Sequence, residues 1–346
     1  MVAQLPSSSN VFVPDHAASG KLVVDFSRNP NKFAVNRYAQ IVPVKQVIGY
    51  YLKMTVEEAG RILNADGANF AWPDGMNAPE DFDGTESHEF LQFGTKRYKF
   101  GTTLGDLTID QASWDIAAKH SEVKAQQAMT FRTVKALAAL TTSGNYDAAN
   151  TSAVGSISGN TGNWAASTTA RGDIKRSLYH ACEKILDATL GVVEPEDLML
   201  VMSTGCAKEL SCTQEIVDHI KGSPDSLAQV RGELPGRNAF YGLPDKLFGI
   251  NIEIEKTRKV TSRKGLTRVV APALADATPF ICARPGGLEG KYGGPSFSTC
   301  TIFMHEEMTV ERKPDTDNRL TRVRVVENYD VVMTAPVTGF LFTSAV

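Results

Sequence analysis

Side chains that could bind a metal ion occur in a few short stretches of the sequence. Residues 305–307 read His-Glu-Glu, but neighbouring side chains of an extended segment point to opposite faces, so only His305 and Glu307 could share a metal ion. Residues 315–317 open like a calcium-binding loop, yet Leu320 stands where such a loop needs glycine. The sequence therefore predicts no metal centre and no cofactor.

An acidic turn offers the other possible chemistry. Asp81, Asp83 and Glu86 include pairs of carboxylates such as a glycosidase uses for acid and base, although any acidic turn can supply them. The five cysteines are scattered without a Cys-x-x-Cys motif, so we expect neither zinc nor disulfides, and a reducing cytoplasm suits them. We predict that the chain is not an enzyme. A soluble enzyme with a cryptic carboxylate site remains an alternative, which loss of turnover on mutating Asp83 or His305 would support.

The overall composition is that of a globular protein. The chain has 346 residues, of which 42% are hydrophobic and 22% charged, with a net charge of −3. This charge argues against strong nucleic-acid binding by the chain as a whole. No apolar run approaches the roughly 18 residues that a transmembrane helix requires, and the first residues lack the pattern of a secretory signal.

A long helix is predicted over residues 108–140, and the rest of the chain is organised around it. Thr108 and Gln111 have the spacing of a capping box, and no proline or glycine interrupts the segment. Such a helix would be roughly 45–50 Å long. Its apolar positions, with Val123 among them, recur at helical spacing but are diluted by charged residues. We interpret it as a strut between two β-rich regions, and an ordinary amphipathic helix buried on one face is the alternative.

Two segments of opposite charge precede this helix. Residues 1–53 look like an extended arm, with six Lys and Arg against two Asp, a net charge of +4. In it, Pro43 favours an edge strand or a strand shared between chains. Residues 55–107 have four basic against ten acidic residues, a net charge of −6. Their last part, residues 88–104, has the composition of a β-ribbon, which is marginal alone and needs a surface to lie on.

The region after the long helix alternates between helical and strand patterns, which gives an α+β fold class. A second helix is predicted over residues 169–190. In the strand that contains Ile250, Ile252 and Ile254, the residues between them, Asn251, Glu253 and Glu255, are expected to face outward. Further strands are expected at residues 197–203, 276–282, 300–313, 319–333 and 339–345, with a hairpin turn at 314–318.

This order of parts resembles the major capsid protein fold shared by tailed bacteriophages, encapsulins and the herpesvirus capsid floor. The carrying stretches are LQFGTKRYKFGTTLGDLTIDQASWD, EPEDLMLVMSTGCAKEL and GLPDKLFGINIEI, and the resemblance covers about residues 40–346. It implies an extended N-terminal arm, a β-ribbon extended loop, a long spine helix, a peripheral domain and an axial domain. The implied boundaries are 1–54 for the arm, 55–107 for the extended loop, 108–193 for the peripheral domain with its spine helix, 194–295 for the axial domain and 296–346 for the closing sheet.

The resemblance also implies a structural function. Such a protein self-assembles into hexamers and pentamers, which close into an icosahedral shell around double-stranded DNA. The implied partners are further copies of the chain, a portal and decoration proteins, with weak, non-specific contact to DNA. A separate scaffolding protein is expected because residues 1–30 show no long, charged helical segment. The implied location is the virion, after assembly in the host cytoplasm. An encapsulin-like compartment, which holds cargo protein instead of DNA, is the second alternative.

Contacts between subunits are the candidate site under this interpretation. Opposite charges on the arm and the ribbon favour contact between neighbours. We expect the ribbon to lie over the adjacent subunit, with aromatic residues buried and acidic residues meeting basic ones. The candidate residues are Phe70, Trp72, Asp81, Phe82, Asp83, Glu86 and Phe90, together with Arg37 and Lys45 of the arm.

Overall fold

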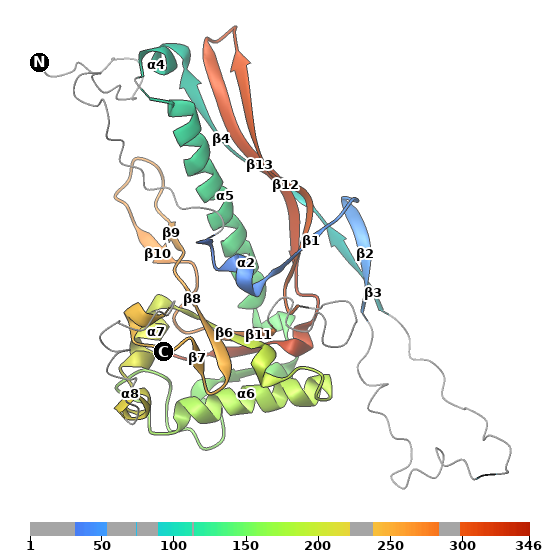
Figure 1. Cartoon of the computed structure of the whole chain (residues 1–346), viewed down its shortest axis with the longest axis vertical. Coiled ribbons are helices and arrows are strands. Elements are labelled where there is room, and N and C mark those ends of the chain that lie inside the picture. The colour runs from blue at the N-terminus through green and yellow to red at the C-terminus, as the bar shows by residue number, and fades with distance from the viewer. Residues whose placement is uncertain (1–31, 54–73, 75–88, 113, 222–237, 284–297) are drawn as a thin grey trace, which may run out of the picture.

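A computed structural model describes residues 32–53, 74, 89–112, 114–221, 238–283 and 298–346. The fold is of the α+β class, as predicted, and is built around two sheets (Figure 1). A four-stranded sheet runs beside the long helix α5, and a six-stranded sheet lies across one end of that helix. Two strand pairs, β2–β3 and β9–β10, form separate two-stranded sheets.

The four-stranded sheet has the strand order β1-β12-β13-β4. Its strands are β1 (Gln40–Pro43), β12 (Thr301–Asp315), β13 (Leu320–Val332) and β4 (Lys96–Gly105). β12 and β13 form the predicted hairpin, and Arg319 at its turn has a positive φ of 48°. β1 pairs in parallel with β12 as an edge strand, in agreement with the prediction from Pro43, which has no N–H to donate.

The predicted helix over residues 108–140 is two helices, so the prediction was wrong at its start. α4 (Asp106–Gln111) comes first, and α5 (Ile116–Leu140) follows after a break in which Ala112 is extended. Thr108 is buried within α4 and caps nothing. The N-cap of α5 is Asp115, whose carboxylate accepts a hydrogen bond of 2.9 Å from the backbone N–H of Ala118.

The buried face of α5 also differs from the predicted stripe. Val123 is 48% exposed. The face that packs on the sheet carries small and apolar residues in the second half of the helix: Ala128, Met129, Ala136, Leu137 and Leu140. Arg132 lies on the same face, because it has an ion-pair partner there, Glu327 of β13. Arg132 is one of the charged residues that interrupt the apolar positions of this helix in the sequence.

The six-stranded sheet holds the main apolar core, together with helices that cover it. Its order is β5-β14-β11-β6-β8-β7. The strands are β5 (Thr151–Ala153), β14 (Phe340–Thr343), β11 (Phe280–Ala283), β6 (Leu198–Ser203), β8 (Ile250–Glu255) and β7 (Lys246–Leu247). The helices are α6 (Asp173–Thr189), α7 (Thr204–Ser211) and α8 (Gln214–Lys221). Every residue of β6 is buried, and Ser203 caps α7 by accepting from Cys206 N–H at 3.1 Å.

One face of β8 departs from its predicted exposure. Ile250, Ile252 and Ile254 are buried, as expected, but Glu253 and Glu255 are buried too. They are covered by the short helix α2 (Val35–Tyr38), which belongs to the segment expected to be an extended arm. Arg37 Nη1 lies 2.5 Å from a carboxylate oxygen of Glu253, and the Tyr38 hydroxyl donates to Glu255 at 3.1 Å. Residues 33–38 of this segment are thus anchored in the core of their own chain.

The domain boundaries expected from the sequence remain a prediction. Helix α6 begins at Asp173, later than expected, and packs in the core of the six-stranded sheet. β14 is a strand of that sheet and lies next to β11. Both were assigned to the peripheral domain, whereas β6 and β8 were assigned to the axial domain. The sheet therefore joins segments that the sequence had assigned to two different domains.

Candidate assembly surface

The β2–β3 ribbon has one face that is anchored to the subunit. β2 (Ile48–Lys53) and β3 (Glu89–Gly94) are antiparallel. On the inner face, the ring of Phe93 stacks on that of Phe303 in β12, with 4.3 Å between centroids and 12° between planes. Tyr51 stacks on the same Phe303 ring at 5.7 Å. The ribbon predicted over residues 88–104 therefore differs from the observed one: β3 pairs with β2, from the segment assigned to the arm, and β4 belongs to the four-stranded sheet. The surface under its inner face belongs to the same chain.

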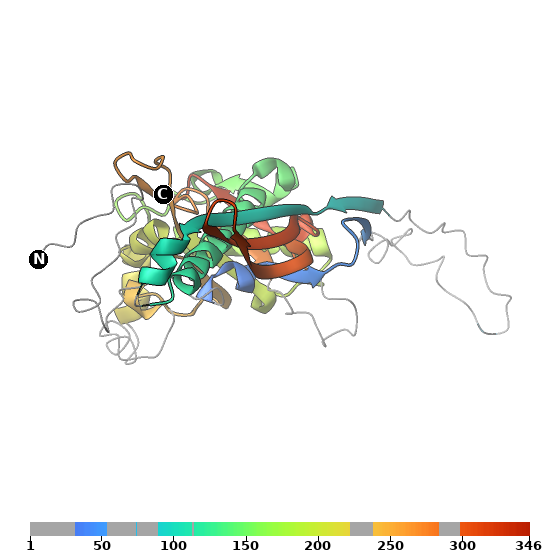
Figure 2. The same ribbon diagram turned by 90° about the horizontal axis from the view of Figure 1, so that it is seen from above.

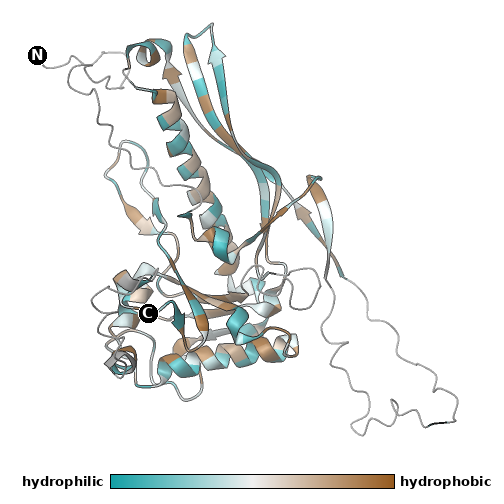
Figure 3. Cartoon of the chain, in the orientation of Figure 1, coloured by the Kyte–Doolittle hydropathy of each residue, from teal (hydrophilic) through white to brown (hydrophobic). Residues whose placement is uncertain are grey.

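The outer face of the ribbon is mostly apolar, and the described residues leave it exposed. Ile48, Tyr50 and Phe90 project from it with 58%, 67% and 68% of their surface exposed. Figure 3 shows apolar residues along this ribbon, at the margin of the molecule in Figure 2. Burying an apolar side chain of this size contributes about 1.5–3 kcal/mol. We name this three-residue face the ribbon patch. It is the best-formed candidate for a contact with another subunit.

The structure places three of the residues that the sequence proposed as contacts. Phe90 belongs to the ribbon patch, and Lys45 is exposed in the segment between β1 and β2. Arg37 instead pairs with Glu253 inside its own subunit. The others lie outside the described residues: Phe70, Trp72, Asp81, Phe82, Asp83 and Glu86. Sequence reasoning missed Ile48 and Tyr50, although alternation in the strand that contains them could have placed both on one face.

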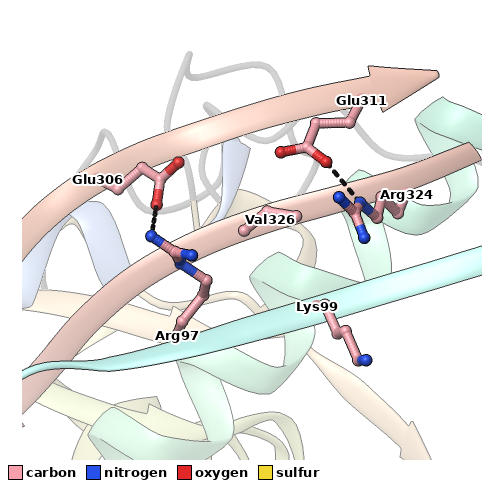
Figure 4. A pocket seen from close by; sticks show the side chains of 6 residues that line it. All are labelled: Arg97, Lys99, Glu306, Glu311, Arg324 and Val326. Carbon is pink, nitrogen blue, oxygen red and sulfur yellow. Dashed lines mark hydrogen bonds and ion pairs between the residues drawn. The ribbon is translucent and has the colours of Figure 1, made fainter. Parts of the chain in front are cut away.

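The face of the four-stranded sheet that points away from α5 carries a charged recess (Figure 4). Its volume is about 230 Å³. Arg97 of β4 pairs with Glu306 at 3.3 Å, and Arg324 of β13 pairs with Glu311 at 2.5 Å. Lys99 lies beside them and forms no ion pair with a described residue. The recess is lined by paired charges, which suits a solvated face or a rim of salt bridges better than a substrate site.

The described residues do not form a metal site. Within these ranges no three His, Cys, Asp or Glu side chains are grouped to hold a metal ion. Among the residues proposed for metal binding, His305 Nδ1 lies 3.3 Å from the Val44 carbonyl oxygen and Glu307 is exposed. Burial raises the pKa of Cys182 to about 11 and the pKa of Cys206 to about 12, so both remain thiols at neutral pH.

Membrane insertion has no support in the described helices. None of them combines the length and the apolarity needed to cross a bilayer.

Comparison with known proteins identifies the fold. No family model and no curated protein matches the sequence. Solved structures match over most of the chain. A phage-related protein from Bordetella bronchiseptica has 12% identity and a TM-score of 0.58, over 89% of this chain and 90% of that one. The mature capsid of bacteriophage PhiM1 has 12% identity and a TM-score of 0.54, over 97% and 91%. The capsid of cyanophage P-SCSP1u has 11% identity and a TM-score of 0.55, over 94% and 91%.

These likenesses confirm the fold that the order of parts predicted. The chain has the fold of phage major capsid proteins, with the long helix α5 beside an elongated sheet. Coverage is nearly complete in both directions, so the likeness extends well beyond a shared motif.

Proposed function

We propose that this protein is the major capsid protein of a tailed double-stranded-DNA bacteriophage or a related particle. It assembles into hexamers and pentamers that close into a shell, and its role is structural and not catalytic. The observation that carries the proposal is the end-to-end likeness to capsid subunits, which covers 97% of this chain in the PhiM1 capsid. The location that follows is the virion, after assembly in the host cytoplasm.

We propose further that the ribbon patch packs on the neighbouring subunit. A two-stranded ribbon is marginal alone. Its inner face is fixed by Phe303, whereas Ile48, Tyr50 and Phe90 remain exposed. The acidic residues Asp81, Asp83 and Glu86, and the aromatic residues Phe70, Trp72 and Phe82, belong to the same loop in the sequence and would extend this contact. Each contact is modest, but repetition around a closed shell multiplies it.

Negative-stain microscopy with sedimentation tests the shell directly. We expect the purified protein to form closed shells, or rings of five or six subunits, with or without a co-expressed scaffolding protein. Nucleic acid in the shells supports a phage particle, whereas cargo protein supports a compartment. A uniform dimer or tetramer over a range of salt concentrations, with the scaffolding protein present, would contradict the proposal.

Substitution in the ribbon patch tests the contact. Tyr50→Ser together with Phe90→Ser should prevent shell formation while the subunit stays folded, because neither residue is needed for its own core. Val123→Ser, on an exposed position of α5, is the matched control and should leave assembly intact. Normal shells from the double variant would show that the patch faces solvent. The scaffolding, portal and decoration partners are separate proposals, which co-purification from infected cells would test.

A further inference from the structure

A basic hairpin follows β8 and projects from the six-stranded sheet (Figure 1). It consists of β9 (Arg258–Val260) and β10 (Val270–Pro272), which pair with each other in a two-stranded sheet. Figures 1 and 2 show it as a separate ribbon that leaves the body after β8. Six lysines and arginines, and no acidic residue, occur between residues 256 and 275, in a chain whose net charge is −3.

The hairpin is built firmly at its base. The N–H of buried Thr257 donates to Glu255 at 2.9 Å, and the N–H of Ala273 donates to the Thr257 carbonyl at 2.9 Å. Two cationic side chains at the base also make contacts with the rest of the chain. Arg258 Nη2 donates to the Thr204 hydroxyl at 2.6 Å, and the Lys256 ammonium lies 5.6 Å from the centroid of the Tyr241 ring. These contacts fix the direction in which the hairpin points.

The tip is ordered by its own backbone and carries cations without acidic partners. The N–H of Thr261 donates to the Val269 carbonyl at 3.0 Å, and Gly265 makes the turn with a φ of 90°. Arg263, Lys264 and Arg268 are all exposed, and none forms an ion pair with a described residue. We name these three residues the tip cations.

The partner that fits this surface is a polyanion. All charges of the hairpin are positive and lie on β9 and in the turn that follows it, so the potential there has one sign. The segment from 256 to 275 contains no Asn or Gln, the side chains that pair with adenine, so it is suited to backbone phosphates more than to base edges. A two-stranded β-ribbon also has the width that enters the major groove of B-DNA. The exposed Val260 and Val270 form a cross-strand pair that supports the hairpin itself.

We propose that the β9–β10 hairpin contacts the phosphate backbone of double-stranded DNA without sequence specificity. The proposal rests on the DNA-containing shell proposed above and deepens it, because it assigns the DNA contact to this hairpin instead of the N-terminal arm. It also orients the subunit, since the face that carries the hairpin must line the interior. One contact is weak, and the many copies of a shell would multiply it.

The test measures DNA binding by unassembled full-length subunits. A fluorescein-labelled 30-bp duplex is titrated by anisotropy at 50 and 200 mM salt. Three phosphate contacts by the tip cations predict a loss of affinity of about 40-fold over this range, from a slope of about −0.9 per neutralised phosphate. The triple variant R263E/K264E/R268E should bind DNA far more weakly, with a smaller salt slope.

A control of equal charge separates a local contact from a net-charge effect. R312E/K313E/R319E reverses three exposed cations at the tip of the β12–β13 hairpin and should retain most of the DNA binding. Equal losses in the two variants, or no binding by the native protein at 50 mM salt, would overturn the proposal.

Microscopy of R263E/K264E/R268E is the second measurement. Closed shells that form normally and retain less DNA support the proposal, whereas failure to assemble would assign the hairpin to a protein contact and overturn it. Shell formation by the native protein is scored separately, so the function proposed above can hold when the hairpin proposal fails.

Discussion

The buried ion pair between α5 and β13 gives the sharpest prediction about stability. Arg132 and Glu327 have 6% and 0% of their side-chain surface exposed, and the Arg132 guanidinium also lies 5.4 Å from the centroid of the Tyr329 ring. Arg132→Met removes the cation and leaves a buried carboxylate without its partner. Loss of one member of a buried pair costs about 3–5 kcal/mol. We therefore expect Arg132→Met to lower the free energy of unfolding by about 3–5 kcal/mol at pH 7.5.

The pH dependence follows from the pKa of Glu327. Burial raises this pKa, and Arg132 offsets only part of the effect. The folded protein therefore binds the proton more readily than the unfolded chain does. Protonation of Glu327 thus stabilises the folded state. This contribution is fully present below the pKa of the unfolded chain, about 4.3, and is lost as the pH rises through the pKa of Glu327 in the folded protein. Removal of Arg132 raises the folded pKa further, so the destabilisation should be largest at pH 7.5 and smaller near pH 5.

Urea unfolding of unassembled subunits, followed by fluorescence, measures these changes, because Trp164 is fully buried in the core. The double variant R132M/E327L should recover most of the loss, since apolar residues can replace a buried pair at little cost. Arg97→Met breaks the exposed pair with Glu306 and should cost at most about 1 kcal/mol. If Arg132→Met cost no more than Arg97→Met, or if its cost were independent of pH, the pair would not be desolvated as argued.

Three further predictions concern the core and its caps. A thiol reagent should titrate one cysteine, Cys212, in the native protein and all five in urea, because the other four are buried; more than one reactive native thiol would refute their burial. Gly205→Ala should lower the free energy of unfolding by about 1–3 kcal/mol, because the new methyl group collides with the Asp276 carboxylate, whereas Gly144→Ala has open space and should be neutral by the same urea unfolding. Glu215→Ala should cost about 1–3 kcal/mol by thermal or urea unfolding, because the carboxylate accepts three backbone N–H groups at the start of α6, at 3.1–3.2 Å. Glu215→Gln, which keeps one acceptor oxygen, should cost less, and an equal cost would argue against this role.

The sequence allowed prediction of elements whose signals are local. The apolar run of β6, its cap at Ser203 and the β12–β13 hairpin turn were all predictable because each depends on adjacent residues. The break before α5 was missed, because Asp115 as a cap competes with a plausible capping box seven residues earlier. Local sequence patterns could not predict the burial of Glu253, because its partner Arg37 lies 216 residues away.

The candidate site was predictable only in part for the same reason. Phe90 was proposed from its place in an aromatic loop, but its neighbours Ile48 and Tyr50 come from another segment, which joins it only through strand pairing. The tip cations gave a clear signal in the sequence as a run of basic residues without acids. That signal is lost when charge is summed over the whole chain.

The pairing of β1 with β12 has a consequence for the order of synthesis. His305 in β12 lies 3.3 Å from Val44, which is 261 residues earlier in the chain. Residues 40–43 can therefore take their place in the sheet only after β12 has been synthesised, when most of the chain is already made. β14, near the very end, then fills an interior position of the other sheet. A chain that ends before residue 301 lacks both strands together with Phe303, so its β2–β3 ribbon has no support for its inner face.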